Sequence, residues 1–303
     1  MIRFGAEVAA ARDAGTPIVA LESSVLAQGL PIPANREAER RICAAVRAGG
    51  AVPAITAVVR GHPTVGLAGD DLARFLARDG VTKVASRDLA PAMAQGRDGA
   101  TTVAASLTLA AAAGLEVFAT GGIGGVHREP AYDESADLLE LARTPVITVC
   151  AGAKSILDLP ATLERLDTYG VTVLGYRTEE FPGFFTAQTG LRVPARVDSP
   201  AAIAAIFRAS RALGRRSALL VVQPPPADAA LDAALVEHAV AQALHEARTA
   251  GVQGAAVTPF LLAAVERATG GRSLTANLAL LEANAGLAAA IAVALAETGP
   301  SGV

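Results

Sequence analysis

Lysine occurs at only two positions of this chain, Lys83 and Lys154, although the chain has 26 basic residues. Both lysines stand among small and β-branched residues rather than in runs of charge. A lysine amine in a desolvated or cation-rich pocket can lose its proton and attack a carbonyl or acetal carbon, whereas an arginine guanidinium stays protonated. A genomic preference for arginine would leave the same composition. The two lysines are therefore candidate nucleophiles that need supporting residues.

Those supporting residues follow apolar runs that are typical of buried strands. Glu22 follows the run 17–21, the glycine-rich run 121–125 follows 117–120, and Lys154 closely follows 146–150. Ligands of open α/β sheets collect at the carboxyl ends of strands, so we expect these residues to converge. An amine, a carboxylic acid and glycine-loop amides that hold phosphate would together suit cleavage of a phosphorylated sugar.

The order of elements predicts an α/β fold, a single-domain α/β/α layered architecture around a central mixed, largely parallel sheet. Asn35 is expected to cap the helix that ends at Ala48. No linker or fixed-period repeat divides the chain, so residues 1–303 are expected to form one domain. The predicted strands are 17–21, 51–59, 81–85, 117–120, 146–150, 171–175 and 219–222. The predicted helices are 35–48, 70–78, 101–113, 135–143, 200–213, 227–250 and 273–296.

Composition narrows the class of protein. A net charge of −3 and a pI of about 5.9, with no basic cluster among aromatics, give no reason to expect nucleic-acid binding. Gly, Thr or charge interrupts the apolar stretches, and the amino terminus has no signal-like hydrophobic region, so neither a membrane partner nor export is expected. Cys43 and Cys150 are expected to be reduced and packed, in a cytoplasmic protein.

Longer motifs resemble those of the pseudouridine-5′-phosphate glycosidase family. The two most specific are Ala-Thr-Gly-Gly-Ile-Gly-Gly-Val-His-Arg at 119–128 and Cys-Ala-Gly-Ala-Lys-Ser-Ile-Leu-Asp at 150–158. The likeness covers nearly the whole chain and is looser in its carboxyl-terminal half. Further matching segments lie at 20–24, 81–84, 99–104, 135–137 and 258–262.

The resemblance implies an enzyme of the pseudouridylate synthase type, a carbon–oxygen hydro-lyase by class. It would reversibly cleave the C–C bond between uracil C5 and ribose C1′, giving uracil and ribose 5-phosphate. Carbon is a poor leaving group, which favours a covalent route. Lys154 matches the lysine that forms a Schiff base at C1′ of the opened ribose, and Glu22 matches the proton donor, whose acid form partial burial would favour.

The same resemblance implies the substrate and metal contacts. Asp133 matches the single aspartate that holds Mn²⁺, but residues 128–132 form a loop about two residues shorter than the family pattern. Lys83 matches a lysine that pairs with the 5′-phosphate and helps to lower the pKa of Lys154. The family also implies a homotrimer. The matching substrate-binding residues are Lys83, Val103, Thr120, His127, Ser135, Ala136, Asp137 and Asn277.

Other readings of these residues stay open. An aldolase-type Schiff-base lyase of sugar phosphates could use the same two lysines on another bond. A non-catalytic sugar-phosphate sensor would need Lys154 only as a cation, and a pyridoxal-phosphate enzyme would also need a lysine and a phosphate cup. Asp133 and Ser135 could simply cap the following helix.

Overall fold

A parallel sheet forms the centre of the molecule in this computed structural model, which describes residues 1–129, 132–252 and 257–297. Neighbouring strands run parallel in the order β3-β2-β7-β9-β13-β11-β12. The middle strands are apolar on both faces, as expected for a sheet covered on both sides by helices. The strands are β2 (Ile18–Leu21), β3 (Val52–Val59), β7 (Val117–Ala119), β9 (Ile147–Cys150), β11 (Thr172–Tyr176), β12 (Ala195–Val197) and β13 (Leu219–Val222).

Strand β3 is long enough to join a second group of strands to this sheet. Its first half pairs with β2, and its second half pairs antiparallel with β4 (His62–Val65) and β6 (Asp98–Thr101). β1 (Arg3–Phe4) pairs parallel with β4, and β5 (Val81–Val84) pairs parallel with β6. A separate pair, β8 (Val126–His127) and β10 (Leu157–Asp158), is antiparallel. The sheet is therefore mixed and largely parallel, as predicted.

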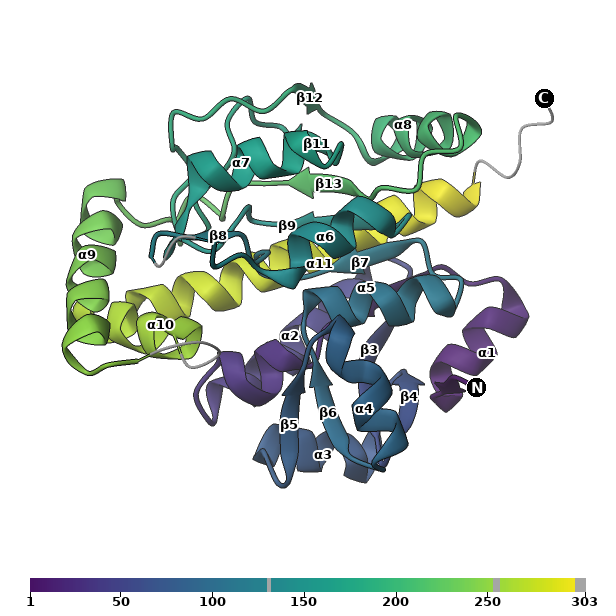
Figure 1. The fold of residues 1–303 in the computed structure, drawn as a ribbon. Coiled ribbons are helices and arrows are strands. Elements are labelled where there is room, and N and C mark those ends of the chain that lie inside the picture. The colour runs from purple at the N-terminus through teal and green to yellow at the C-terminus, as the bar shows by residue number, and fades with distance from the viewer. Residues whose placement is uncertain (130–131, 253–256, 298–303) are drawn as a thin grey trace.

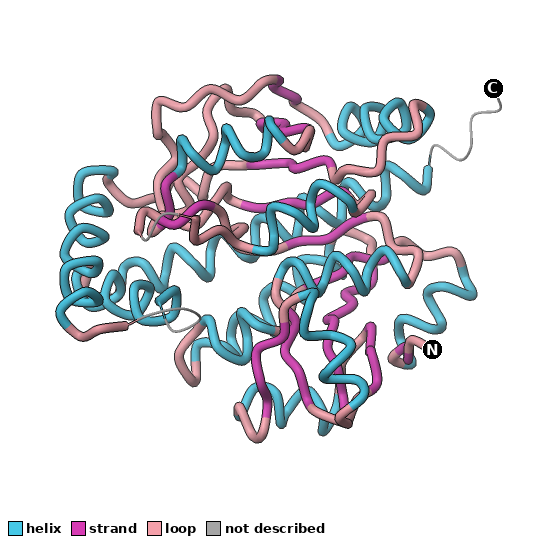
Figure 2. The backbone as a smooth tube through the Cα atoms, in the orientation of Figure 1, coloured by secondary structure: helices cyan, strands magenta, loops and turns pink. Residues whose placement is uncertain are grey.

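Helices cover both faces of the central sheet, as Figures 1 and 2 show. On one face α11 (Arg272–Glu297) packs on β2, β7 and β9, with α2 (Ala34–Ala48) and α8 (Pro200–Ala212) beside it. On the other face lie α5 (Val103–Ala112), α6 (Ala136–Arg143) and α7 (Leu159–Thr168). The remaining helices are α1 (Ala6–Ala14), η1 (Val25–Gly29), α3 (Gly69–Ala77), η2 (Ser86–Asp88), α4 (Leu89–Ala94), α9 (Ala233–Thr249) and α10 (Val257–Ala268).

Helix α11 is the core helix. Its length and mean hydropathy of 1.9 would allow it to cross a membrane, but half of that apolar window is buried inside the protein. It passes close to the end of α2, where a Cβ at Gly49 would lie 2.5 Å from that of Ala289. A core helix and a membrane span can have the same apolar composition. Here the packing of α11 inside the protein accounts for that composition.

Some local expectations were wrong. Asn35 does not cap α2; it is fully buried in the first turn, and its amide donates to the carbonyls of Leu26 and Leu76 at 3.0 and 2.8 Å. Thr101 ends β6 rather than beginning a helix, and the helix expected from residue 227 begins at Ala233. The sequence did not predict β1, β4, β6, β8, β10, β12, α1, α4, α7 or α10.

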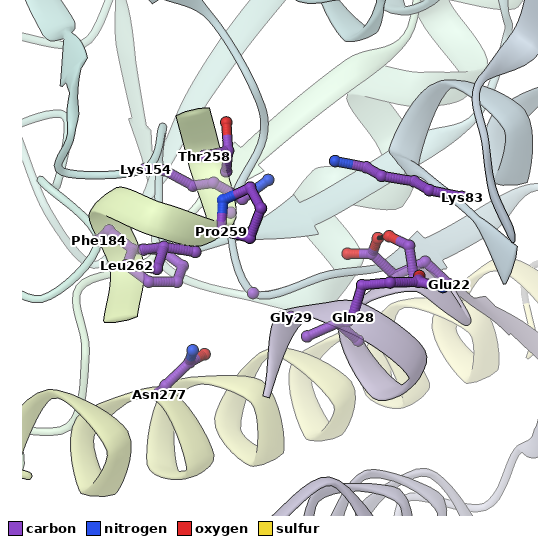
Figure 3. A pocket seen from close by; sticks show the side chains of 14 residues that line it. Glu22, Gln28, Gly29, Lys83, Lys154, Phe184, Thr258, Pro259, Leu262 and Asn277 are labelled. Atoms are coloured by element: carbon purple, nitrogen blue, oxygen red, sulfur yellow. Dashed lines mark hydrogen bonds between the residues drawn. The ribbon is translucent and has the colours of Figure 1, made fainter. Parts of the chain in front are cut away.

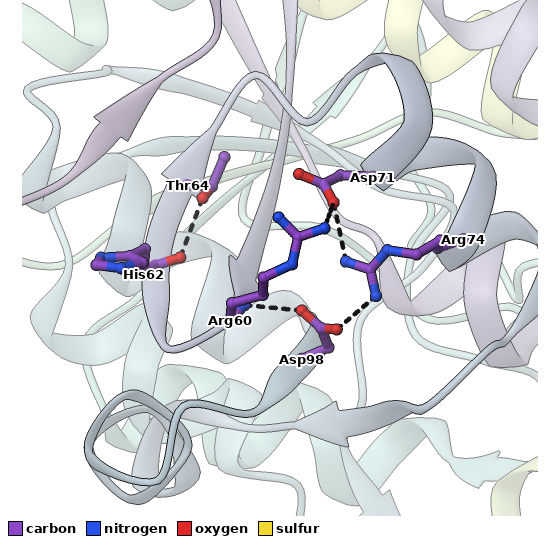
Figure 4. A network of polar contacts seen from close by, with 6 residues as sticks. All are labelled: Arg60, His62, Thr64, Asp71, Arg74 and Asp98. Atoms are coloured by element: carbon purple, nitrogen blue, oxygen red, sulfur yellow. Dashed lines mark hydrogen bonds and ion pairs between the residues drawn. The ribbon is translucent and has the colours of Figure 1, made fainter.

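A network of ion pairs ties α3 to the second group of strands (Figure 4). Arg74 donates to Asp98 at 2.6 Å and to Asp71 at 2.9 Å, and Arg60 also pairs with Asp71 at 2.9 Å. The hydrogen bonds that Arg74 donates to Asp98 and Asp71 raise its pKa. Burial tends to raise the pKa of Asp98, but Arg74 and the backbone amide of Arg60 lower it overall. Asp98 lies on β6, and β6 pairs with β5, the strand that carries Lys83. The network therefore helps to hold that strand in place.

Candidate active site

Three adjacent strands deliver the candidate catalytic residues to one edge of the sheet. β2, β7 and β9 are neighbours, and at their carboxyl ends come Glu22, Thr120 and the loop that carries Lys154. Lys83 arrives from β5, in the second group of strands. Glu22, Lys83 and Lys154 all line the same two connected cavities. The predicted convergence is therefore confirmed, with Lys83 within its strand rather than beyond its end.

Glu22 is buried and held by two hydroxyl groups. The residue as a whole is only 6 % exposed. Thr120 Oγ1 donates to one carboxyl oxygen at 2.5 Å, and Ser24 Oγ donates to the other at 2.7 Å. The expected burial is confirmed. Thr120 thus positions Glu22.

Lys154 sits in a loop that is tied to the glycine run. Its backbone N–H donates to Ile123 O at 3.1 Å, and Ile123 N–H donates to Gly152 O at 3.0 Å. The lysine is half-buried. Within the described residues no carboxylate lies within 4.0 Å of its amino group. A lysine that lacks an ion-pair partner inside a cleft is available to act as a nucleophile.

Lys83 faces Lys154 across the cleft, and Figure 3 shows the two amino groups pointing toward one another. Lys83 is open to solvent, but the surrounding cleft walls desolvate it in part. This desolvation lowers the pKa of Lys83, the charge of Lys154 lowers it further, and Glu22 and Asp137 oppose the shift. Two cations facing one space make that space attractive to an anion.

The first of the two cavities is mainly apolar, and we call it the apolar chamber. It measures about 370 Å³ and borders the second cavity at Glu22, Lys83 and Lys154. Gln28 and Asn277, which carry side-chain amides, also line it. Its other lining residues include Val25, Gly121, Gly122, Phe184, Thr258, Pro259 and Leu262. A flat heterocycle would bury well between these groups.

The second cavity, the polar chamber, measures about 460 Å³. Two helices begin at it: α5, capped by Thr102, and α6, capped by Ser135. Within the described residues the N–H groups of Val103 and Ala136, the first residues of these helices, have no acceptor. Helix amino termini with free N–H groups bind anions, so the polar chamber suits a phosphate.

Val103 and Asp137 both line this chamber, and their contacts with a substrate stay predictions. Val103 is only 1 % exposed, so little of it is open to a ligand. Asp137 accepts from Ala104 N–H at 2.9 Å and from Gly124 N–H at 2.8 Å. Its carboxylate therefore fixes the start of α5 to the glycine run. Ser135 caps α6, as one alternative predicted.

The glycine run is less open to a phosphate than expected. The amides of Ile123 and Gly124 and that of Val126 donate to protein acceptors. Glycine is required at 124 by close approach, because a Cβ there would lie 2.3 Å from Ser135 Oγ and 2.8 Å from Asp137 Oδ2. The small glycine residues thus mainly allow α5, α6 and the Lys154 loop to pack closely together at the cleft.

His127 and Asp133 lie on one wall of the polar chamber. His127 N–H donates to Asp133 O at 2.9 Å, and its Nδ1 is 3.9 Å from a carboxylate oxygen of Asp133. Desolvation lowers the pKa of His127; Asp133 opposes this, while Lys154 and Lys83 add to it. The lowered pKa favours the neutral form of His127.

The residues present fit a metal ion that keeps most of its water ligands. Within residues 1–129, 132–252 and 257–297 no three His, Cys, Asp or Glu side chains are grouped to hold one. Glu134 is paired with Arg165, and Asp137 is engaged with amides, so Asp133 is the carboxylate left at this wall. One carboxylate, water and a ligand phosphate form an acceptable oxygen set for a hard divalent ion.

Neither thiol is suited to catalysis. Cys43 and Cys150 are buried and unpaired, as predicted. Burial raises the pKa of each to about 12. Because the thiolate is the reactive form, both are inert at neutral pH.

Several residues at the cleft were missed. Arg87 and Asp88 line the polar chamber, and Gln28 and Phe184 line the apolar one. Phe184 has a φ of 66°, in the left-handed region that costs a non-glycine residue energy, and such strain gathers at functional sites. Aromatic residues make up only 4 % of the chain, so the run Phe-Pro-Gly-Phe-Phe at 181–185 was an available signal.

The chain is similar to known proteins over nearly its whole length. The family model described as indigoidine synthase A like protein matches residues 7–294. A curated protein of Gemmatimonas aurantiaca named pseudouridine-5′-phosphate glycosidase is 66% identical over 96% of this chain and 95% of its own length. One of the same name from Herpetosiphon aurantiacus is 54% identical over 95% of this chain and 96% of its own.

Solved structures show the same fold. The prealnumycin C-glycosynthase AlnA, crystallised with ribulose 5-phosphate, has a TM-score of 0.90 and 38% identity over 98% of this chain and 97% of its own. An indigoidine synthase A-like protein from Thermotoga maritima also has a TM-score of 0.90, with 35% identity over the same shares of each chain. The resemblance stated from the motifs is confirmed. The chain belongs to the family of indigoidine synthase A like proteins, which includes relatives named pseudouridine-5′-phosphate glycosidase.

Proposed function

We propose that this chain is a pseudouridine-5′-phosphate glycosidase. It reversibly cleaves the C–C bond between uracil C5 and ribose C1′, and the products are uracil and ribose 5-phosphate. The observation that carries the proposal is the placement of Lys154, which has no ion-pair partner within the described residues, at the junction of the two chambers and in the same cavities as Glu22. The relatives' names supply the substrate.

The two chambers suit the two parts of this substrate. The ribose phosphate would lie in the polar chamber, where the amides of Val103 and Ala136 and the ammonium of Lys83 favour a phosphate. Uracil would lie in the apolar chamber, over Phe184 and beside two side-chain amides. The bond to be broken then lies at the junction, next to Glu22 and Lys154.

Covalent catalysis accounts for the cleavage of a carbon leaving group. The neutral amine of Lys154 bonds to C1′ while the C1′–O4′ bond breaks, and O4′ takes a proton. Glu22 then protonates uracil C5, and the C1′–C5 bond breaks as its electrons restore the uracil ring. The nitrogen lone pair forms the C=N bond of a Schiff base. Water hydrolyses this Schiff base to ribose 5-phosphate and the free lysine.

Glu22 must present a proton to C5 at the right moment. Thr120 and Ser24 hold both of its oxygens, so the carboxyl group cannot rotate away from the junction. Lys83 would hold the phosphate.

Mn²⁺ belongs to this proposal, and Asp133 is the residue that would hold it. The chemistry it would supply is neutralisation of the charge of the phosphate. We also propose a homotrimer in the cytoplasm, with no nucleic-acid or membrane partner. The family resemblance supports these assignments.

Release of uracil is the direct test. The protein is incubated with pseudouridine 5′-phosphate, with and without Mn²⁺, and uracil is separated and measured by absorbance. An aldolase-type lyase or a sugar-phosphate sensor releases none. Lys154→Arg keeps the positive charge but cannot form an imine, so it should abolish turnover and spare binding of ribose 5-phosphate.

A further inference from the structure

Two side-chain amide oxygens are buried at the apolar chamber without a hydrogen-bond partner. They are Oε1 of Gln28, in η1, and Oδ1 of Asn277, in α11. Both residues line the chamber. A buried amide oxygen that accepts nothing is costly, because water no longer solvates it. Two such oxygens at one cavity indicate that a ligand with N–H donors completes them.

The amide of Gln28 has only its oxygen left to offer. Its NH₂ group lies 3.4 Å from the carbonyl oxygen of Val81, on the strand that carries Lys83. A carbonyl oxygen only accepts, so this contact fixes which end of the amide faces it. Oε1 is therefore held as an acceptor at the chamber.

Asn277 differs because its whole amide is free. Within the described residues neither end of its side chain has a hydrogen-bond partner. Seven residues further along α11, Asn284 is saturated: it donates to Thr120 O at 2.8 Å and accepts from Gln223 at 2.9 Å. One asparagine of the core helix thus serves the fold, while the other is open to a ligand.

We infer that Gln28 accepts the N1–H of uracil, and that Asn277 pairs with its N3–H and a neighbouring carbonyl. This inference rests on the proposed function. N3–H lies between two carbonyls, so that edge suits an amide that can both accept and donate, whereas N1–H has C6–H on its other side and can be served by a group that only accepts.

The consequence is selection for a carbon-linked base. Pseudouridine is joined through C5 and keeps hydrogen on N1, whereas uridine 5′-phosphate is joined through N1 and has none. A site built to accept a hydrogen bond discriminates strongly against a ligand that lacks the donor, because the buried acceptor is then left unpaired. Gln28 is thus a specificity-determining residue.

The test compares pseudouridine 5′-phosphate with its 1-methyl derivative, in which a methyl group replaces the hydrogen on N1. We expect the unaltered protein to prefer the unmethylated substrate in kcat/KM by about 5- to 150-fold, the range for leaving a buried acceptor unpaired. Gln28→Met keeps the length of the side chain and removes the acceptor, so the preference should fall to about one. Gln28→Glu keeps an acceptor and should restore a preference.

Asn277→Leu is the matched control. It should lower kcat/KM for both substrates and keep their ratio, because it does not touch the N1 edge. If Gln28→Met lowers both substrates equally, or if the unaltered protein cleaves both equally well, the inference is wrong. If no uracil is released from pseudouridine 5′-phosphate, the proposed function itself fails.

The unaltered protein also gives a test that needs no variant. Competition by uracil, 1-methyluracil and 3-methyluracil against cleavage should show both methyl compounds to be at least about fivefold weaker than uracil. Equal inhibition by uracil and 1-methyluracil would overturn the assignment of Gln28.

Discussion

Replacing Asp137 by alanine tests whether its carboxylate fixes the wall of the polar chamber. Asp137 is 5 % exposed, and its two oxygens each accept one backbone N–H, from Ala104 and from Gly124. A hydrogen bond to a charged group contributes about 1.5–3 kcal/mol, so the loss of two predicts a fall of about 3–6 kcal/mol in the free energy of unfolding. Urea unfolding followed by circular dichroism measures it.

Asp232→Ala is the control for this experiment. Asp232 is exposed and caps α9 through one hydrogen bond, to Leu235 N–H at 3.0 Å. Loss of such a cap costs about 1 kcal/mol. Asp137→Asn keeps one acceptor and should fall between the two alanine variants. If Asp137→Ala costs no more than Asp232→Ala, the carboxylate does not brace the glycine run, and direct ligand binding becomes its better explanation.

Three further predictions follow from the site and the ion-pair network. Glu22→Gln should lower uracil release by about 10²–10⁴-fold, because the amide cannot donate the proton, while borohydride trapping of ribose 5-phosphate persists; loss of trapping as well would contradict this role. Lys83→Met should raise KM by about tenfold or more with a smaller change in kcat, and an unchanged KM would remove Lys83 from the phosphate site. The lowered pKa of Asp98 stabilises the fold above about pH 3.8, the ordinary pKa of this side chain, and this stability is lost as the pH falls through the folded-state pKa. Asp98→Asn should therefore be less stable than the unaltered protein by about 1–3 kcal/mol at pH 7, and the gap should shrink toward pH 3; a constant gap in urea titrations would refute the ion pair with Arg74.

The strands and the site edge could be predicted because they depend on local pattern. β9 and β13 are buried on both faces, so their β-branched runs stand out in the sequence. The residues that follow parallel strands then meet at one edge by geometry alone. Glu22, Thr120 and Lys154 were found in this way.

What was missed depends on contacts between distant segments. Asn35 looks like a helix cap, but its amide serves two carbonyls, one of them 41 residues away. The two hydrogen bonds by which Asp137 joins the start of α5 to the glycine run could not be predicted either, because they depend on the fold. The unpaired oxygens of Gln28 and Asn277 likewise become visible only when the cavity and its neighbours are known.

Very short strands were beyond the sequence pattern for a different reason. β1, β8 and β10 have two residues each, too few to show an alternation of polar and apolar side chains. β8 carries His127 and pairs with β10, which follows the Lys154 loop. The pairing that brings these two motifs together is thus set by tertiary contacts.

The central claim is that Lys154 forms the covalent bond to the sugar. The most direct measurement is reduction with borohydride in the presence of ribose 5-phosphate, followed by mass spectrometry of the peptides. We expect one reduced sugar-phosphate adduct on Lys154, none on Lys83 and none in the Lys154→Arg variant. An adduct on Lys83, or no adduct while uracil is still released, would contradict it.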